Sequence, residues 1–138
     1  MIKLKIIKLF LINEEVKKFC KLNNFYLIKL DEKIKLEEFF NVKVDLKIVS
    51  GSNGLAISSC KNYNCNGTIE LGNHLLDHEY KKQGPITKNS LGKNMVIAIM
   101  AHEFAHIFQY THPEFKFKSA VIQEIHADLL AGWYMAQY

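Results

Sequence analysis

The feature that most constrains this chain is a long apolar stretch, residues 95–108, whose only polar side chains are His102, Glu103 and His106. A helix that is apolar almost all round is typical of a buried element. Burying an unpaired polar group costs on the order of 1–3 kcal/mol, and a buried charge costs more. A metal ion that coordinates both imidazoles would remove this cost. The stretch therefore predicts a metal site within the core.

The spacing of the three polar residues fits that interpretation. Residues four apart on a helix project from nearly the same side, so His102 and His106 converge on one point. Glu103 follows the first histidine by one residue, beside the ion but too far round the helix to coordinate it easily. It is placed to accept a proton from a metal-bound water as general base. We expect this helix to run from about Leu91 to Tyr110, because the residue before Pro113 disfavours helix.

A second helix, predicted over residues 119–137, supplies the remaining candidates. A catalytic zinc usually takes three protein ligands and leaves a position for water. Glu124 is the predicted third ligand, and Asp128, one helical turn further on, is expected to hydrogen-bond a ligand histidine. The apolar residues of this helix recur at three- and four-residue steps, the pattern of an amphipathic helix: Val121, Ile125, Leu129, Trp133 and Ala136.

These residues together resemble a known family. The matching positions are His102-Glu103-Phe104-Ala105-His106, then Gln109, then Glu124-x-x-Ala127-Asp128 and Ala131-Gly132. They resemble the gluzincin metallopeptidases, most closely the small predicted neutral zinc metallopeptidases, whose pattern is HExGHxxQ followed by ExxAD and AG. The resemblance covers about residues 95–135, and Ala105 replaces the family's usual glycine.

The resemblance implies a zincin-like fold and hydrolysis of a peptide or protein substrate through one catalytic zinc ion. By resemblance, His102, His106 and Glu124 hold the zinc, Glu103 is the catalytic base, and Asp128 supports a ligand. It also suggests that a strand before the active-site helix binds extended substrate. The candidate strand is Thr68, Ile69, Glu70 and Leu71, on the expectation that it is an unpaired sheet edge.

Several alternatives stay open at this point. Candidates for stabilising the oxyanion are His112, Tyr110, Tyr134 and Tyr138. His126 should point away from the metal and serve packing or the surface. The rival function is a catalytically inactive zinc-binding pseudo-peptidase that acts as a regulatory or protein-interaction module. The alternative without a metal is an amphipathic helix with two solvent-facing histidines, which the surrounding apolar residues and the matching Glu124 and Asp128 disfavour.

The rest of the chain predicts a single α+β domain over residues 1–138, with an N-terminal antiparallel or mixed sheet packed on the two helices. Residues 1–72 are expected to form mainly strands and short helices. The expected strands lie near Ile2–Ile6, Phe25–Leu30 and Thr68–Leu71, with a short helix after Asn13 and a hairpin over residues 42–58. A loop is expected from His74 to Asn89.

The cysteines allow more than one interpretation. Cys20, Cys60 and Cys65 are an odd number, which favours reduced thiols over a disulfide framework. Cys60, Cys65, His74 and His78 loosely resemble a structural zinc site, although the middle spacing is short. A Cys60–Cys65 disulfide is the third possibility.

Composition excludes some classes of protein. The net charge of +4 comes wholly from lysine, since the chain contains no arginine. A specific nucleic-acid reader usually depends on the bidentate guanidinium, so no nucleic-acid partner is expected. Lysines interrupt the apolar N-terminal stretch, and no segment reaches membrane-spanning length, so we expect no signal peptide, no membrane partner and a cytoplasmic location. The oligomeric state is left open.

Overall fold

The computed structural model describes residues 31–61, 64–83 and 91–137. After a helical segment at residues 31–40, the elements are β1 (Val44–Val49), β2 (Gly54–Ile57), β3 (Gly67–Gly72), α3 (Asn73–Gln83), α4 (Leu91–Thr111), the short 3-10 helix η1 (Pro113–Phe115) and α5 (Ala120–Ala136). The α+β class is thus confirmed. The strands and helix predicted within residues 1–30 lie outside the described residues.

The described strands form one mixed sheet in the order β1-β3-β2. β3 pairs with β1 in parallel and with β2 in antiparallel orientation. The predicted hairpin over residues 42–58 is therefore wrong, because β3 inserts between the two strands that should have paired. The turn at Gly51–Gly54 is present, but it carries the chain past the position that β3 later fills.

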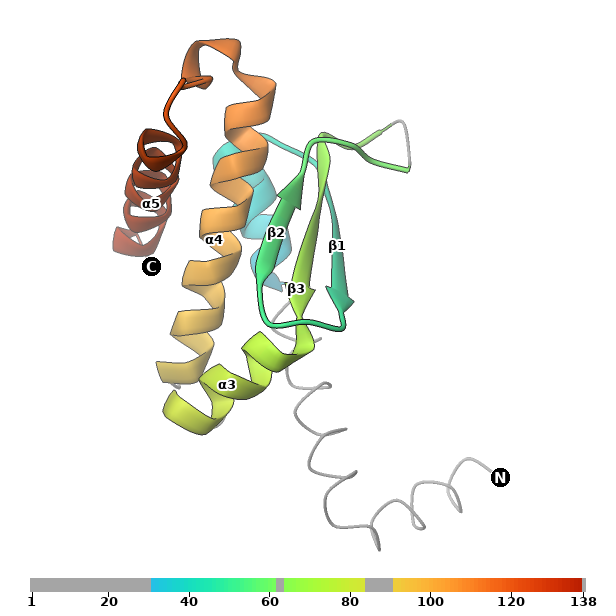
Figure 1. Cartoon of the computed structure of the whole chain (residues 1–138), viewed down its shortest axis with the longest axis vertical. Helices are drawn as coiled ribbons and strands as arrows, with labels where there is room; N and C mark the ends of the chain where they lie inside the picture. The colour runs from blue at the N-terminus through green and yellow to red at the C-terminus, as the bar shows by residue number, and fades with distance from the viewer. Residues whose placement is uncertain (1–30, 62–63, 84–90, 138) are drawn as a thin grey trace, which may run out of the picture.

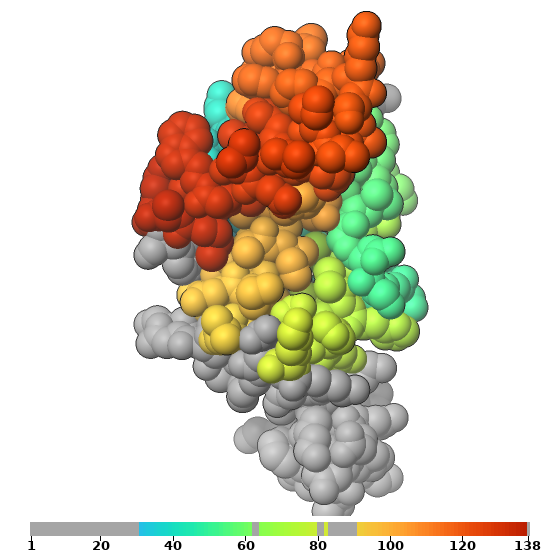
Figure 2. Space-filling view, turned by 60° about the vertical axis from the view of Figure 1, so that its left-hand side comes forward, coloured from blue at the N-terminus to red at the C-terminus, as the bar shows by residue number. Residues whose placement is uncertain are grey.

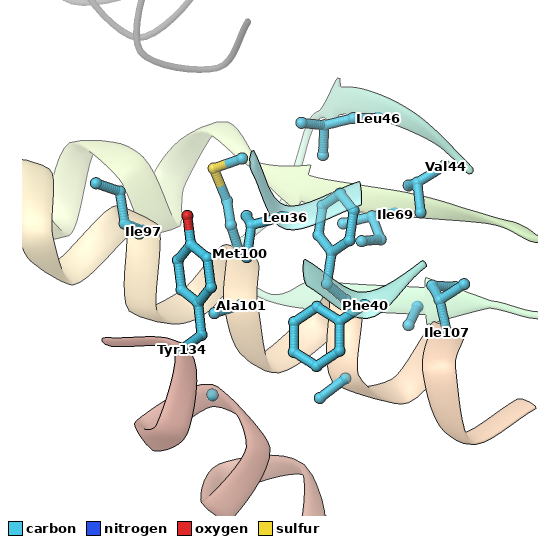
Figure 3. Packing of buried hydrophobic residues seen from close by; sticks show 14 of the residues in the cluster. Leu36, Phe40, Val44, Leu46, Ile69, Ile97, Met100, Ala101, Ile107 and Tyr134 are labelled. Carbon is cyan, nitrogen blue, oxygen red and sulfur yellow. The ribbon is translucent and has the colours of Figure 1, made fainter. Parts of the chain in front are cut away.

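Alternation along the strands gives the sheet one apolar face. Val44, Leu46, Ile69 and Leu71 are buried, whereas Asp45, Lys47 and Glu70 on the other face are partly exposed. The apolar face packs on α4 and on residues 31–40, and Figure 3 shows the side chains from these elements meeting in one cluster. Figure 1 shows α4 between the sheet and α5, so α4 is the central element of the described part.

The segment after β3 is helical, so the loop expected from His74 to Asn89 is wrong for its first half. α3 covers Asn73–Gln83 and buries Leu76 and Glu79. Few positions of α3 are apolar, but its leucine, glutamate, lysine and glutamine residues favour helix. Its buried leucine packs in the core, and the helix contacts α4. The helix also fixes the turn before β2, since Asn73 Oδ1 accepts from the Gly51 N–H at 3.2 Å.

Both long helices predicted from the sequence are confirmed, with ends within a residue or two of the predicted ones. The orientation of α5 differs from expectation. Its predicted apolar stripe faces outward, with Val121, Ile125, Leu129 and Trp133 all more than half exposed. The buried positions are instead Ala127, Ala131 and Tyr134. Small side chains at the contact let α5 approach α4 closely.

No helix in the described ranges is long and apolar enough to cross a membrane.

A charged cluster joins residues 31–40 to the start of the sheet. The buried carboxylate of Glu37 contacts the ammonium groups of Lys33 and Lys43, the latter at 3.0 Å. Burial alone would raise the pKa of Glu37, but the hydrogen bonds and charges of the two lysines outweigh it and lower the pKa. The ionised carboxylate is therefore favoured in the folded state.

We expect Glu37→Gln to lower the free energy of unfolding at neutral pH by about 1 kcal/mol. A lowered native pKa stabilises the fold above the unfolded-state pKa, and this contribution is lost as the pH falls through the native value. Urea denaturation at neutral pH and in acid, below the native pKa, measures the difference. The difference in unfolding free energy between wild type and Glu37→Gln should vanish in acid. The control Glu38→Gln, on the exposed face, should show no such pH dependence. A difference that persists in acid would contradict the ion-pair explanation.

Candidate metal centre

The first part of the site is a pair of imidazoles on α4. His102 and His106 lie one helical turn apart, with ring centroids 4.7 Å apart and Nε2 atoms 3.0 Å apart. The side chain of His106 is 10% exposed and that of His102 is 23% exposed. The pair therefore lies at the margin of the core, where solvent can reach one ring.

The second part is a carboxylate that α5 brings to the same point. The chain reverses through η1, and Ser119 caps α5 by accepting a hydrogen bond from the Ile122 N–H. Glu124 then lies beside both rings: its Oε2 is 3.1 Å from Nε2 of His102, and its Oε1 is 3.3 Å from Nε2 of His106. Figure 2 shows α5 and the segment leading to it lying over one side of α4.

Two further side chains determine which ring nitrogens carry protons. Asp128 Oδ1 lies 2.8 Å from Nδ1 of His102, and an ionised carboxylate can only accept, so this nitrogen donates. Gln109 Oε1 lies 2.8 Å from Nδ1 of His106. The Gln109 amide nitrogen donates to the Gln123 carbonyl at 2.9 Å, which fixes the orientation of the amide. His106 Nδ1 must therefore also be the donor.

This proton arrangement leaves an unbalanced cluster of acceptors. A ring that holds its proton on Nδ1 presents a lone pair at Nε2 when it is neutral, and the Glu124 carboxylate faces the Nε2 atoms of both rings. Three acceptor groups about 3 Å apart repel one another unless a proton or a metal cation lies between them. Zinc ligands about 2.0–2.1 Å from a tetrahedral ion are about 3.3–3.4 Å from one another. The two Nε2 atoms are 3.0 Å apart, and each lies 3.1–3.3 Å from a different oxygen of the Glu124 carboxylate, so the donor set can converge on such an ion.

Glu103 lies next to this cluster but faces the sheet. Its side chain is buried, and burial raises its pKa above the usual range for a carboxyl group. The neighbouring imidazoles act in the opposite direction, while the charge of Glu124 adds to the rise. A carboxylate with a raised pKa is a better proton acceptor near neutral pH.

The position of Glu103 depends on a glycine in β2. A Cβ built on Gly54 would lie 2.5 Å from Oε1 of Glu103 and 3.1 Å from its carboxyl carbon. Real Cβ atoms essentially never approach so closely, so only glycine allows the carboxylate to rest against this strand.

Gly54→Ala should therefore displace the Glu103 carboxylate while leaving the ligand atoms in place. If Glu103 acts in catalysis, a displacement of about 1 Å lowers kcat by about 10²-fold. Steady-state kinetics and the zinc content of the variant are the measurements, with Ser52→Ala in the preceding turn as the control. Unchanged kcat with unchanged zinc would show that the carboxylate position is not critical.

Several predicted site residues lie elsewhere. The Tyr134 hydroxyl donates to Glu32 Oε2 at 3.1 Å inside the core, so it is not an oxyanion candidate. The His112 ring stacks on Phe108, and its Nδ1 lies 2.8 Å from the Phe108 carbonyl oxygen. These contacts hold the ring at the C-terminal end of α4. Tyr138 lies outside the described residues. Tyr110 remains near the site, with its ring centroid 6.4 Å from that of His106.

The predicted substrate strand also needs correction. Thr68–Leu71 belongs to β3, which pairs on both sides and is therefore not an edge. Among the described strands, β2 has the free edge beside α4. The sequence shows that both segments are strands, but the order of strands in a sheet depends on pairing across long distances in the chain.

The cysteine cluster is resolved as a disulfide between Cys60 and Cys65, so the expectation of reduced thiols there is wrong. With both sulfurs bonded to each other, they do not form a zinc site with His74 and His78. Because disulfides are rare in the reducing cytosol, the bond gives no support to the predicted cytoplasmic location, which stays a prediction.

Sequence reasoning named Gln109 as part of a motif without a role and missed Gly54. Gln109 is almost fully buried and links His106 to His126, whose Nδ1 accepts from the amide at 2.9 Å. His126 itself packs between the rings of Phe115 and Phe117, as a packing role predicts. The sequence signal for Gln109 is its position three residues after a candidate ligand histidine. Gly54 reads as an ordinary turn glycine, so the sequence carries no signal of its contact with Glu103.

Within the described ranges, His102, His106 and Glu124 are the only group of His, Cys, Asp or Glu side chains placed to hold a metal ion. Comparison with known proteins found no family model that matches the chain, and no curated protein or solved structure with significant similarity to it.

Proposed function

We propose that this protein is a zinc-dependent peptidase of the gluzincin kind, in which His102, His106 and Glu124 hold one zinc ion and Glu103 is the general base. The observation that carries the proposal is the convergence of two imidazole nitrogens and one carboxylate, with contacts of 3.0–3.3 Å between them, beside a second, buried carboxylate. A set of two imidazoles and one carboxylate suits zinc and leaves a fourth position for water.

Each residue has a separate task in this proposal. Zinc, when bound, supplies a Lewis acid and lowers the pKa of a coordinated water. Glu103 accepts the water proton and later delivers it to the leaving amine. Asp128 and Gln109 hold His102 and His106 in the tautomer that presents Nε2. A zincin-like architecture is part of the same proposal.

Access to the site supports a polymeric substrate. The Glu124 side chain is 59% exposed, so the cluster opens to solvent on the side of α5. On the other side, the outer edge of β2, which no described strand covers, runs beside α4. An extended peptide can add to such an edge through backbone hydrogen bonds, which would bring its carbonyl groups past the cluster.

The test is metal analysis of the purified full chain together with hydrolysis of casein, an unfolded protein substrate. We expect one zinc ion per chain, cleavage that stops when a chelator removes the metal, and recovery when zinc is restored. His106→Ala should lose both zinc and cleavage, whereas His74→Ala, an exposed histidine on α3, should keep both.

The two failures of this test have different meanings. Zinc binding without cleavage of casein or of a peptide mixture would favour the inactive zinc-binding module. A chain that binds no zinc at neutral pH would remove the metal site and both functions with it.

A further inference from the structure

No described strand pairs with the outer edge of β2, and the backbone groups on that edge form a defined set. In an antiparallel pair, residues alternate between those whose N–H and C=O point at the partner and those that point away. The Asn53 carbonyl accepts from the Gly72 N–H at 2.9 Å, so Asn53 faces β3. By alternation Leu55 also faces β3, and Gly54 and Ala56 present their backbone groups to the open side.

One of these outward groups is already occupied. The Tyr110 hydroxyl, from the last turn of α4, donates to the Ala56 carbonyl at 3.3 Å. Tyr110 follows His106 by one helical turn, and the two rings are nearly parallel, with 19° between their planes. Its side chain is not locked in the core, because Tyr110 is 47% exposed. A half-exposed tyrosine therefore covers the hydrogen-bonding position that an added strand would need.

The contacts of α4 with β2 also define where a substrate bond would lie. Glu103 rests against Gly54, and Tyr110 reaches Ala56, two residues further along the strand. On the helix, His106 lies between Glu103 and Tyr110. A peptide laid along β2 would therefore pass the candidate metal ligands with the carboxylate toward one end and the phenol toward the other.

We propose that Tyr110 has two positions: its hydroxyl occupies the Ala56 carbonyl in the free protein, and an extended peptide displaces it and receives its hydrogen bond. The incoming peptide donates a backbone N–H to the Ala56 carbonyl. The released hydroxyl then donates to the carbonyl oxygen of the peptide bond to be cleaved. This inference rests on the proposed peptidase function and adds a substrate requirement, an extended segment with a free N–H opposite Ala56.

The exchange makes Tyr110 act in opposite directions on binding and on turnover. Its bond to Ala56 competes with the peptide and weakens ground-state binding. Its bond to the scissile carbonyl strengthens as negative charge develops there, and loss of one such donor typically costs about 10²–10³-fold in kcat. A variant without the hydroxyl should therefore bind peptide more tightly and cleave it more slowly.

The kinetic test is Tyr110→Phe in the full chain, with the shortest casein-derived peptide that the wild-type protein cleaves. We expect kcat to fall by about 10²-fold and KM to fall as well, with zinc content and melting temperature unchanged. Tyr134→Phe, which removes a phenol in the core, should leave both kinetic constants unchanged. An unchanged kcat, or a KM that rises, would overturn the proposal.

A second measurement does not depend on turnover. In zinc-loaded Glu103→Gln protein with ¹³Cζ-labelled tyrosine, adding casein should shift the Tyr110 resonance, assigned by its absence in the Tyr110→Phe variant, and leave the Tyr134 resonance in place. An unmoved Tyr110 resonance would overturn the proposal. A shift in a protein whose wild-type form never cleaves casein would instead retain the two-position tyrosine and reject the peptidase function.

Discussion

Replacing Glu103 with glutamine should leave zinc bound and lower peptide hydrolysis by about 10²–10⁴-fold, the range that a general base contributes. The amide keeps the shape of the side chain but cannot accept a proton. Glu103 is not in the group of side chains placed to hold a metal ion, and its carboxylate lies beside that group, against Gly54. Zinc content by elemental analysis and kcat with a casein-derived peptide are the two measurements.

A second buried carboxylate provides the control for this variant. Glu79 on α3 is 7% exposed and lies outside the cluster, so Glu79→Gln makes the same chemical change away from the site. It should keep normal kcat. Full activity in Glu103→Gln would refute the assignment of the base, and loss of zinc from it would show that Glu103 contributes to metal binding.

Glu124→Gln should weaken zinc binding by far more than the about 10–100-fold typical of losing a residue that merely supports a ligand. The amide carries no charge to balance the ion, and α5 contributes no other side chain to the candidate metal-binding group. A competition titration with a chromophoric chelator measures the affinity. The control is Glu114→Gln, an exposed carboxylate in η1, which should bind zinc normally.

The same variant tests whether the metal joins the two helices. A ligand that binds only the folded state stabilises it by about 2.7 kcal/mol at 100 times its dissociation constant. Zinc should therefore raise the melting temperature of the wild-type protein, and at the same concentration should scarcely change that of Glu124→Gln. An equal rise in both proteins would place the zinc somewhere other than between α4 and α5.

The parts of the site that could be predicted depend on local geometry. His102 and His106 converge because they are one turn apart on a helix, and the apolar sequence around them marks that helix as buried. Glu124 and Asp128 needed only one further assumption, that the chain folds back through a short turn. η1 and the Ser119 cap provide that turn, and the structure brings both carboxylates to His102.

The parts that could not be predicted depend on contacts between distant segments. β1 and β2 both look like strands, but only the three-dimensional structure shows β3 between them. The outward face of α5 is a similar case, because apolar residues occupy most sides of that helix. Ala127 and Ala131 decide which side packs, by allowing close approach, and the spacing of the larger apolar residues is not informative about it.

The outward face of α5 also carries the only tryptophan in the chain. Trp133 is 61% exposed and its ring centroid lies 5.5 Å from that of Phe39, so its indole senses how α5 sits against residues 31–40. Glu124 lies on the same helix, two to three turns away. The natural fluorescence of the protein is therefore an optical signal from the very helix that would close on the metal, and its response to zinc can be followed without adding a dye.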